Sequence, residues 1–487
     1  MATVLIVVFG IVSGAPSAAP KGKIALTSSD VDGSVYTSLS PVRLLDTRNG
    51  SSIGSGATIS LTIADSHGVP SDATAVALNL TITGPTASSY LTAYAEGSTR
   101  PEVSNINFTA NETIPNLTIV PLGSDGGVSF YNFEGSTNLL VDLEGYFSPA
   151  AAGSSVGTYV PLTPDRIVDT RAGSGKQDAG DTLGSGASIN IQVTGEGGVP
   201  DSGVEAILAN VAVTGTTAAS YLTVYPQGES RPTVSNLNWT SGETIANRVL
   251  IPVSSSGEIT AYNFEGSTNV IVDVDGYVTN STNPPDNASL YYPITPTRLV
   301  DTRSGSGNAY AGDTIGSGDS LKIQVTGVAN IPSGATAVAA NATVTNTTAA
   351  SYLTVYPGGS LPEVSDINWT IGQTISNLTI AALSSDGYVD AYNHLGSTNL
   401  LFDVYGYFLP QGTQAITWTS SDSSPTYGDN YTPTATSSSG LPVTITLDST
   451  STGCTLSSGV VTFTTLGTCV LDANQAGNSN WGPAAQA

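Results

Sequence analysis

The stretch that decides the fold is Arg43-Leu44-Leu45-Asp46-Thr47-Arg48, because the chain contains this motif three times. The other copies are Arg166-Ile167-Val168-Asp169-Thr170-Arg171 and Arg298-Leu299-Val300-Asp301-Thr302-Arg303. The same later landmarks follow each copy, and Tyr131, Tyr262 and Tyr392 are spaced 131 and 130 residues apart. That period is too long for a solenoid unit and has the size of a complete domain. The 487 residues are therefore expected to hold three homologous domains and a fourth, different unit.

The repeats show the period-two pattern of β-strands. In residues 75–83 the even positions are apolar and the odd positions are small or polar, and the other two copies keep this phase. Clusters of Gly, Pro, Asn and Ser separate about eight such segments in each copy. No stretch sustains an amphipathic helical period. The sequence predicts an all-β chain of three tandem β-sandwich domains, jelly-roll-like or Ig-like, with the topology left open.

The domain boundaries are predicted from the repeat landmarks and from short linkers rich in Ala, Gly, Ser or Pro. The three sandwich repeats are expected at residues 34–149, 158–279 and 290–410, and the C-terminal unit at residues 415–487. Each copy carries a full set of strands, so the repeats are expected to be loosely aligned, self-contained beads. Residues 158–279 are accordingly expected to fold alone.

Charge and hydropathy exclude some partners and favour export. The chain has 13 Lys and Arg against 38 Asp and Glu, for a net charge of −25. An acidic chain without basic runs repels nucleic acid and anionic membranes. Residues 1–19 resemble a signal peptide, and the lack of basic residues before Val4 indicates a truncated or misassigned start. No later segment is apolar enough for membrane insertion, so a secreted or cell-surface location is expected.

The only two cysteines are Cys454 and Cys469, in the C-terminal unit. Export to an oxidising compartment favours a disulfide between them. A zinc site would need further ligands, and the only histidines, His67 and His394, lie in other domains. No metal or cofactor site is therefore predicted.

The repeat motifs resemble those of a known group of proteins. R-[LI]-[LV]-D-T-R is followed by Y-L-T-x-Y, S-[ND]-[IL]-N-[FW], Y-N-x-x-G-S-T-N-[LV] and D-x-x-G-Y. This set resembles a repeat of secreted and cell-wall-associated proteins of actinobacteria and related Gram-positive bacteria. The resemblance covers about three quarters of the chain and implies an extracytoplasmic β-domain with no transferable activity.

The tail resembles a bacterial immunoglobulin-like surface repeat, and such repeats serve as spacers or adhesin stalks. The resemblance rests on Tyr427-Gly428-Asp429, Gly453-Cys454 and Gly467-Thr468-Cys469. It implies a smaller Ig-like β domain. The chain stops at Ala487, before the closing strand expected of such a repeat, so the sequence is expected to be a fragment of a longer protein.

The acids that recur in all three copies are interpreted as structural. Asp142, Asp273 and Asp403 lie in apolar strands, and a buried aspartate needs a partner. The recurring arginines are the available partners. The predicted ion-pair residues are Arg43, Asp46, Arg48 and Asp142 in repeat 1, Arg166, Asp169, Arg171 and Asp273 in repeat 2, and Arg298, Asp301, Arg303 and Asp403 in repeat 3. Glu134 and Glu265 have no counterpart in repeat 3, and no histidine recurs, so no catalytic residues are predicted.

One recurring pattern is a candidate binding surface. An aromatic ring follows an asparagine in each copy, at Asn107-Phe108, Asn238-Trp239 and Asn368-Trp369. An exposed aromatic beside an amide suits a sugar ring. The alternative is that these rings are buried in the sandwich, as large aromatic side chains usually are.

These observations favour a non-enzymatic secreted or cell-surface protein with a structural, display or adhesion role. The first alternative is a multivalent carbohydrate-binding array, because three weak sites would reinforce one another on a repetitive glycan. The second alternative is the accessory region of a polysaccharide-degrading enzyme whose catalytic domain is absent here. Glycans or a cell-wall polymer are the candidate partners, and the oligomeric state is left open.

Overall fold

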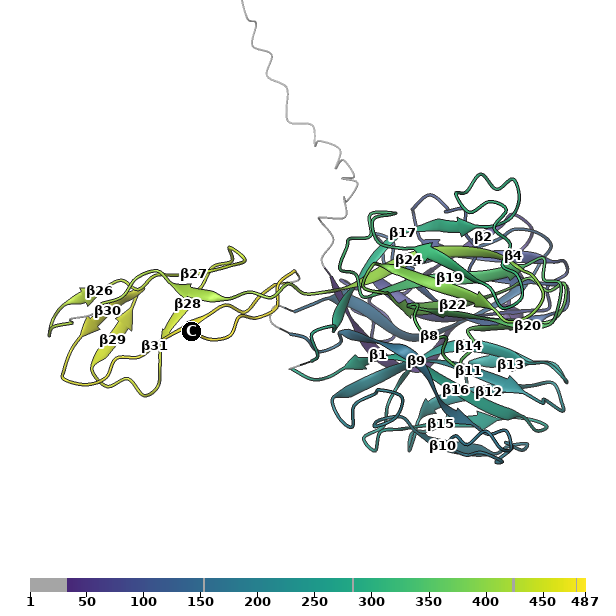
Figure 1. Ribbon diagram of the computed structural model, residues 1–487, viewed down its shortest axis with the longest axis horizontal. Helices are drawn as coiled ribbons and strands as arrows, with labels where there is room; N and C mark the ends of the chain where they lie inside the picture. Colours follow the sequence, from purple (N-terminus) through teal and green to yellow (C-terminus); the bar gives the residue numbers. More distant parts are fainter. Residues whose placement is uncertain (1–32, 152–153, 283, 423–424, 479) are drawn as a thin grey trace, which may run out of the picture. The chain divides into compact units, whose positions relative to one another are not determined.

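The computed structural model describes residues 33–151, 154–282, 284–422, 425–478 and 480–487 (Figure 1). The predicted all-β class is confirmed: the described residues form antiparallel strands and contain no α-helix, only a 3₁₀ turn at Thr47–Asn49. None of them forms a helix long and apolar enough to cross a membrane. The expected signal peptide, residues 1–19, lies outside the described residues.

Each repeat consists of eight strands. Repeat 1 contains β1 (Ser34–Asp46), β2 (Thr58–Thr62), β3 (Ala75–Thr83), β4 (Ser89–Ala95), β5 (Ile106–Phe108), β6 (Thr113–Pro121), β7 (Gly127–Asn132) and β8 (Asn138–Pro149). Repeat 2 contains β9 (Tyr159–Asp169), β10 (Ser188–Gln192), β11 (Val204–Thr214), β12 (Ser220–Pro226), β13 (Leu237–Trp239), β14 (Ile245–Pro252), β15 (Glu258–Asn263) and β16 (Asn269–Thr279). Repeat 3 contains β17 (Ser289–Asp301), β18 (Ser320–Gln324), β19 (Ala337–Thr345), β20 (Ser351–Tyr356), β21 (Ile367–Trp369), β22 (Ile375–Ala382), β23 (Tyr388–Asn393) and β24 (Asn399–Pro410).

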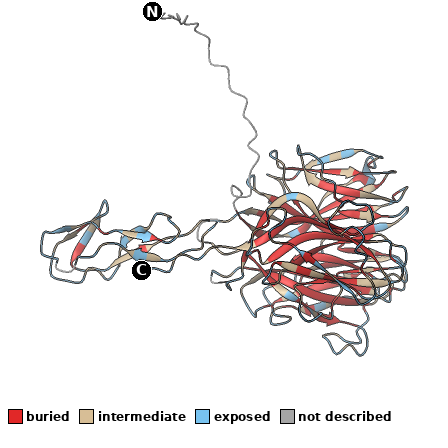
Figure 2. Cartoon of the chain, turned by 45° about the horizontal axis from the view of Figure 1, so that its top comes forward, coloured by how far each residue is buried: buried red, intermediate tan, exposed pale blue. Residues whose placement is uncertain are grey.

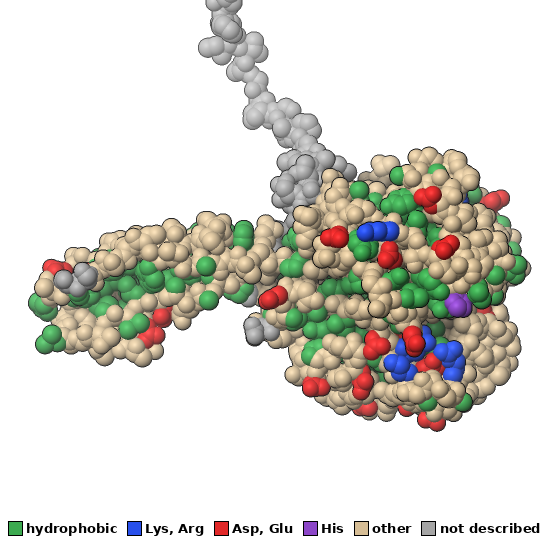
Figure 3. All heavy atoms as spheres, in the orientation of Figure 1, with side chains coloured by type: hydrophobic (Ala, Val, Ile, Leu, Met, Phe, Trp, Pro, Cys, Tyr) green, Lys and Arg blue, Asp and Glu red, His purple; other side chains and the backbone are tan. Residues whose placement is uncertain are grey.

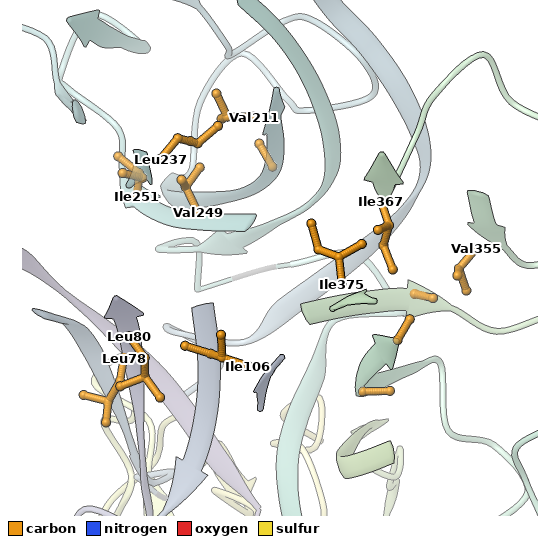
Figure 4. Close-up of a cluster of buried hydrophobic side chains, with 14 of the residues drawn as sticks. Leu78, Leu80, Ile106, Val211, Leu237, Val249, Ile251, Val355, Ile367 and Ile375 are labelled. Carbon is orange, nitrogen blue, oxygen red and sulfur yellow. The ribbon is translucent and has the colours of Figure 1, made fainter. Parts of the chain in front are cut away.

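The strand order within a repeat is that of a jelly roll. In repeat 1 an inner sheet in the order β1-β8-β3-β6 packs against an outer sheet in the order β2-β7-β4-β5, and repeats 2 and 3 keep the same orders. Two four-stranded sheets whose neighbours are mostly distant in sequence are typical of jelly rolls. The alternation seen in the sequence fills the space between the sheets with side chains such as Leu78, Leu80 and Ile106, and Figure 4 shows such groups from all three repeats.

The three inner sheets join into one sheet of twelve strands. Strand β17 pairs with β1 at Tyr291 and Ser34 and with β9 at Ser289 and Tyr159. The backbone amide of Tyr36 closes the third side by donating to the carbonyl of Gly157 at 2.8 Å. The repeats therefore surround a common axis.

Aromatic rings from all three repeats fill this axis. The rings of Phe147 and Tyr291 lie 4.5 Å apart, and those of Tyr159 and Phe408 lie 4.6 Å apart. The Tyr36 hydroxyl donates to the carbonyl of Glu144 at 3.0 Å, and Tyr159 and Tyr291 repeat the contact. In each repeat, a Cβ on the glycine of Asp-x-x-Gly-Tyr would collide with the ring of the axial tyrosine, which is Tyr36, Tyr159 or Tyr291. That collision is the physical reason for a glycine at this place in the motif.

The expectation of loosely aligned, self-contained beads is corrected by this arrangement. Each repeat has its own sandwich interior, but the second face of its inner sheet is also buried, against the other two repeats. Ala75, Ala77, Asn79 and Thr81 are all at most 2% exposed. Figure 2 shows the burial of the inner strands. The predicted boundaries of the repeats stay a prediction.

The C-terminal unit is a set of short strands in three small sheets. They are β25 (Ile416–Trp418), β26 (Asn430–Tyr431), β27 (Ala435–Ser437), β28 (Thr444–Leu447), β29 (Cys454–Ser457), β30 (Val460–Phe463) and β31 (Leu471–Asn474). The predicted disulfide is confirmed: Cys454 and Cys469 are bonded, with Cα atoms 5.6 Å apart.

Candidate functional site

The structure brings together the first and last strands of each repeat through an arginine and an aspartate. Arg43 Nε lies 2.7 Å from Asp142 Oδ1 and its Nη2 donates to Oδ2 at 2.9 Å. Arg166 with Asp273 and Arg298 with Asp403 form the same two-pronged pair. Burial raises the pKa of each of these aspartates, and the arginine opposes that shift. The role supported by this geometry is structural, because both carboxylate oxygens are occupied.

Each aspartate of the second predicted set pairs with the arginine two residues later in the chain. Arg48 Nη2 lies 2.6 Å from Asp46 Oδ2, and the corresponding pairs are Arg171 with Asp169 and Arg303 with Asp301. The hydrogen bond from Arg48 lowers the pKa of Asp46. These pairs extend the Arg43-type pairs toward the surface and leave no recurring acid free for catalysis among the described residues.

Asp273→Asn is expected to lower the free energy of unfolding of the full chain by about 2–3 kcal/mol, because it weakens a hydrogen-bonded pair to a charged group. Arg166 would keep its charge beside a neutral amide. The measurement is chemical denaturation, and Asp201→Asn, an exposed position in the same repeat, is the matched control. Equal stabilities of the two variants would contradict the structural role.

The rings of the predicted binding surface lie in the core. Phe108 is 3% exposed and Trp239 and Trp369 are 4% exposed. Each tryptophan Nε1 donates to a backbone carbonyl, of Ala218 and Ala349. Rings covered on both sides offer no platform to a sugar, so the ligand-binding interpretation of these three rings is corrected.

The asparagines of the same motif face outward beside a different set of rings. Asn107 is opposite Tyr90 in the register of β4 and β5, and opposite residues share one face of a sheet. Tyr90 stacks on Phe133 with ring centroids 4.9 Å apart. Repeats 2 and 3 repeat the arrangement with Asn238, Tyr221 and Phe264 and with Asn368, Tyr352 and His394.

We call these stacked pairs the outer aromatic pairs: Tyr90 with Phe133, Tyr221 with Phe264, and Tyr352 with His394. Phe133 and Phe264 are each 47% exposed. Sequence reasoning missed them because Phe133 and His394 differ in type and follow the end of a strand. Two recurring patterns could have revealed them. A tyrosine precedes Leu-Thr in each repeat, and an aromatic residue lies two positions after the tyrosine of Tyr-Asn.

A closed set of asparagine hydrogen bonds, also missed, links the repeats around the axis. Asn247 Nδ2 donates to Asn79 Oδ1 at 2.9 Å, from repeat 2 to repeat 1. The corresponding donors in repeats 3 and 1 are Asn377 to Asn210 and Asn116 to Asn341. The Oδ1 of Asn247 also accepts from the backbone amide of Leu117 at 3.0 Å. Buried amides satisfied on both sides fix the register of one repeat on the next.

One interface carries a buried charge cluster that the others lack. Arg248 stands where repeats 1 and 3 have Leu117 and Leu378, and it is 1% exposed. It pairs with Asp275 of its own repeat at 2.8 Å and with Asp366 of repeat 3. Burial raises the pKa of both carboxyls above the usual range. The Nε of Arg248 has no acceptor among the described residues, so the cluster is incompletely satisfied.

Glu144 occupies the corresponding place between repeats 1 and 2. Its carboxylate accepts from Asn236 Nδ2 at 3.0 Å and from the amide of Leu250 at 3.2 Å, both in repeat 2. Burial raises the pKa of Glu144 to about 8. The carboxyl is therefore largely protonated at neutral pH.

Glu144 is expected to make the protein less stable as pH rises. Its folded pKa lies above the unfolded value, so the folded state binds the extra proton and stability falls between the two values as pH increases. The loss should reach about 2 kcal/mol between pH 6 and pH 8. The measurement is the free energy of unfolding against pH, and Glu144→Gln should flatten this part of the profile. An unchanged slope in that variant would count against the assignment.

A cavity of about 350 Å³ opens between repeats 1 and 2. Its lining includes Arg43 and Arg48 from repeat 1 and Tyr221, Arg231 and Asn238 from repeat 2. The tyrosine of one outer aromatic pair, Tyr221, therefore borders the ion-paired arginines of the neighbouring repeat together with Asn238. We call this space the 1–2 groove. The electrostatic influence of Arg298 on Tyr90 and of Arg166 on Tyr352 indicates the same neighbourhood at the other two interfaces.

The structure gives no positive evidence for a metal centre. The described residues contain no group of three or more His, Cys, Asp or Glu side chains that could hold a metal ion.

Figure 3 shows few charged side chains on the face drawn, with the blue Lys and Arg groups gathered in small patches among red ones.

Comparisons with known proteins give no family. No protein-family profile matches the chain, and no curated protein matches it. Two solved structures that align with it are described in work on the triple jelly-roll fold and turret assembly of an archaeal virus and on the atomic structure of Sulfolobus turreted icosahedral virus. The first is 11% identical, with a TM-score of 0.16, and covers 77% of this chain and 91% of that chain. The second is 9% identical, with a TM-score of 0.17, and covers 76% and 90%.

Proposed function

We propose that the chain is a non-enzymatic secreted or cell-surface protein with a structural, display or adhesion role. The observation that supports this proposal is the division of its recurring side chains. The acids present in all three repeats are held by arginines, whereas the recurring outward-facing side chains are aromatic rings and amides. Aromatic rings and amides suit recognition of a surface, and a carboxylate held by an arginine is poorly placed to act as a general acid or base.

A test of adhesion also tests the absence of catalysis. Beads coated with the full chain are incubated with Gram-positive cell-wall fragments and with insoluble polysaccharides, and bead retention and released reducing sugar are both measured. We expect retention without release. Release of soluble sugar above that of heat-treated protein would contradict the non-enzymatic role, and no retention on any surface would contradict adhesion.

The second candidate is a multivalent carbohydrate-binding array, which the outer aromatic pairs favour. Each pair presents a flat apolar surface next to an amide, which suits the apolar face and the hydroxyls of a sugar. Three such pairs on one rigid body would reinforce one another on a repetitive glycan.

The combined variant Phe133→Ser, Phe264→Ser and His394→Ser is expected to reduce retention on the bound polysaccharide at least tenfold, because it removes one ring from each outer aromatic pair. Loss of stacking at three sites multiplies when binding is multivalent. The measurement is depletion of the full chain onto the polysaccharide. Leu395→Ser, an exposed neighbour of His394, is the matched control. A combined variant that binds like the parent protein would rule out the array.

A further inference from the structure

The 1–2 groove differs from its two counterparts in the charges that line it. Repeat 2 supplies Arg231 and Thr233 to the groove. The same two positions are Leu361 and Glu363 in repeat 3 and Arg100 and Glu102 in repeat 1. Burial raises the pKa of Tyr90 and of Tyr352, and the nearby carboxylates of Glu102 and Glu363 add a small part of the shift. Only the 1–2 groove combines an arginine with an uncharged residue there.

Arg231 is a cation without a carboxylate partner. Its guanidinium lies over the ring of Tyr262, 3.7 Å from the centroid, and it makes no ion pair among the described residues. Stacking on a ring leaves the N–H edge of a guanidinium available, and that edge matches a carboxylate in two-pronged geometry.

Arg43 contributes a second available donor. Asp142 occupies its Nε and Nη2, and its Nη1 has no ion pair or hydrogen bond within the described ranges. In repeats 2 and 3 the matching nitrogen lies 3.8 Å from Asp169 and from Asp301. Arg43 Nη1 therefore lacks the close carboxylate contact that its two counterparts have.

A buried hydroxyl also lines this groove. Thr81 is 2% exposed, and its Oγ1 has no hydrogen-bond partner in the part of the chain that the structure describes. The counterpart in repeat 2 is Ala212, and in repeat 3 Thr343 accepts from Asn341 at 3.5 Å. An unpaired hydroxyl in a polar cavity is a group that a ligand hydroxyl would satisfy.

We propose that the 1–2 groove binds a single acidic sugar residue, a uronate, within an otherwise neutral glycan. Arg231 and Arg43 would hold the carboxylate, Tyr221 would cover the apolar face of the ring, and Asn238 and Thr81 would bond its hydroxyls. The cavity of about 350 Å³ falls in the range of small-molecule sites. A net charge of −25 repels long polyanions, so the ligand carries its charge on one residue.

The inference deepens the carbohydrate-binding candidate and rests on it. It shares Tyr221 and Asn238 with that candidate, adds Arg43 and Arg231, and predicts a different stoichiometry. The outer aromatic pairs predict three equivalent sites per chain. The 1–2 groove predicts one site for an acidic sugar.

The test is calorimetric titration of the full chain with cellobiouronic acid, which carries one uronate, and with neutral cellobiose. We expect one uronate site per chain, binding at least tenfold tighter than cellobiose and weakening with salt. Arg231→Leu and Thr233→Glu reproduce residues that repeat 3 carries, and each should weaken uronate binding at least tenfold. Arg100→Leu makes the same change in another groove and should leave it unaltered. All three positions are exposed, so thermal stability should not change.

Two outcomes overturn the inference. One is equal binding of cellobiouronic acid and cellobiose, or no binding of the uronate. The other is an equal effect of Arg231→Leu and Arg100→Leu. If uronate binding is lost only in the combined Phe133, Phe264 and His394 variant, the 1–2 groove is excluded and the carbohydrate array stands. If the groove variants lose uronate binding while surface retention is unchanged, the inference stands and adhesion depends on other residues.

Discussion

A fragment of residues 158–279 is expected to show no cooperative thermal transition as a monomer, although the repeat pattern alone predicts that it folds. In the full chain the second face of its inner sheet is buried by the other repeats. Ala206 and Leu208 are fully buried there, and Leu250 is 3% exposed. Separation would expose this apolar face, leave Arg248 without Asp366 and leave Asn247 without Asn79. The hydrophobic term lost grows with the area exposed.

The measurement is circular dichroism during heating at low micromolar concentration, with residues 33–410 as the matched control. That longer fragment keeps all three interfaces and should melt cooperatively. If residues 158–279 fold at high concentration, sedimentation should show association, because copies can cover one another's exposed face. A cooperative, concentration-independent monomer transition would contradict the shared core.

Arg248→Leu is expected to lower the free energy of unfolding by about 3–5 kcal/mol, because it leaves Asp275 and Asp366 buried without their cation. The substitution introduces the residue type found at the same place in repeats 1 and 3. Size and shape alone therefore do not explain the loss.

A triple variant distinguishes the effect of uncompensated buried charge from the effect of local packing. Arg248→Leu with Asp275→Glu and Asp366→Asn reproduces the set that joins repeats 1 and 2, which is Leu117, Glu144 and Asn236. We expect it to recover most of the stability, since a buried ion cluster can be replaced by well-packed residues at little or no cost. Chemical denaturation of the three proteins is the measurement. A triple variant as unstable as Arg248→Leu would show that local packing, not uncompensated charge, causes the loss.

The sequence was sufficient to predict the strands and the all-β class because period-two alternation directly reflects burial of one sheet face. It also predicted the partners of Asp142 and its counterparts, because a charge in an apolar strand requires a cation nearby. The tail disulfide followed from there being only two cysteines. In each case the feature depends on residues close together in the sequence, or on a residue with only one kind of partner available.

The shared core was not predicted because the odd positions of the strand are small or polar and do not show the apolar pattern of a buried face. In β3 the odd positions are Ala75, Ala77, Asn79 and Thr81, and a solvent-facing strand would carry Lys or Glu at some of them. Their small size and lack of charge were the available signal of a second buried face. The jelly-roll order and the 1–2 groove depend on contacts between residues far apart in the chain, and no periodicity encodes those.

The closed ring around the tyrosine axis holds three repeats and leaves no open end. In an open solenoid each added unit extends the stack, so gene duplication can lengthen the protein one unit at a time. Here every repeat already contacts both others, and a fourth unit would find no free face. Because Glu144 with Asn236, Arg248 with Asp366 and Tyr405 with Asn105 are different contacts, the three genetic copies are no longer interchangeable. A substitution at one interface therefore has no exact equivalent at the other two.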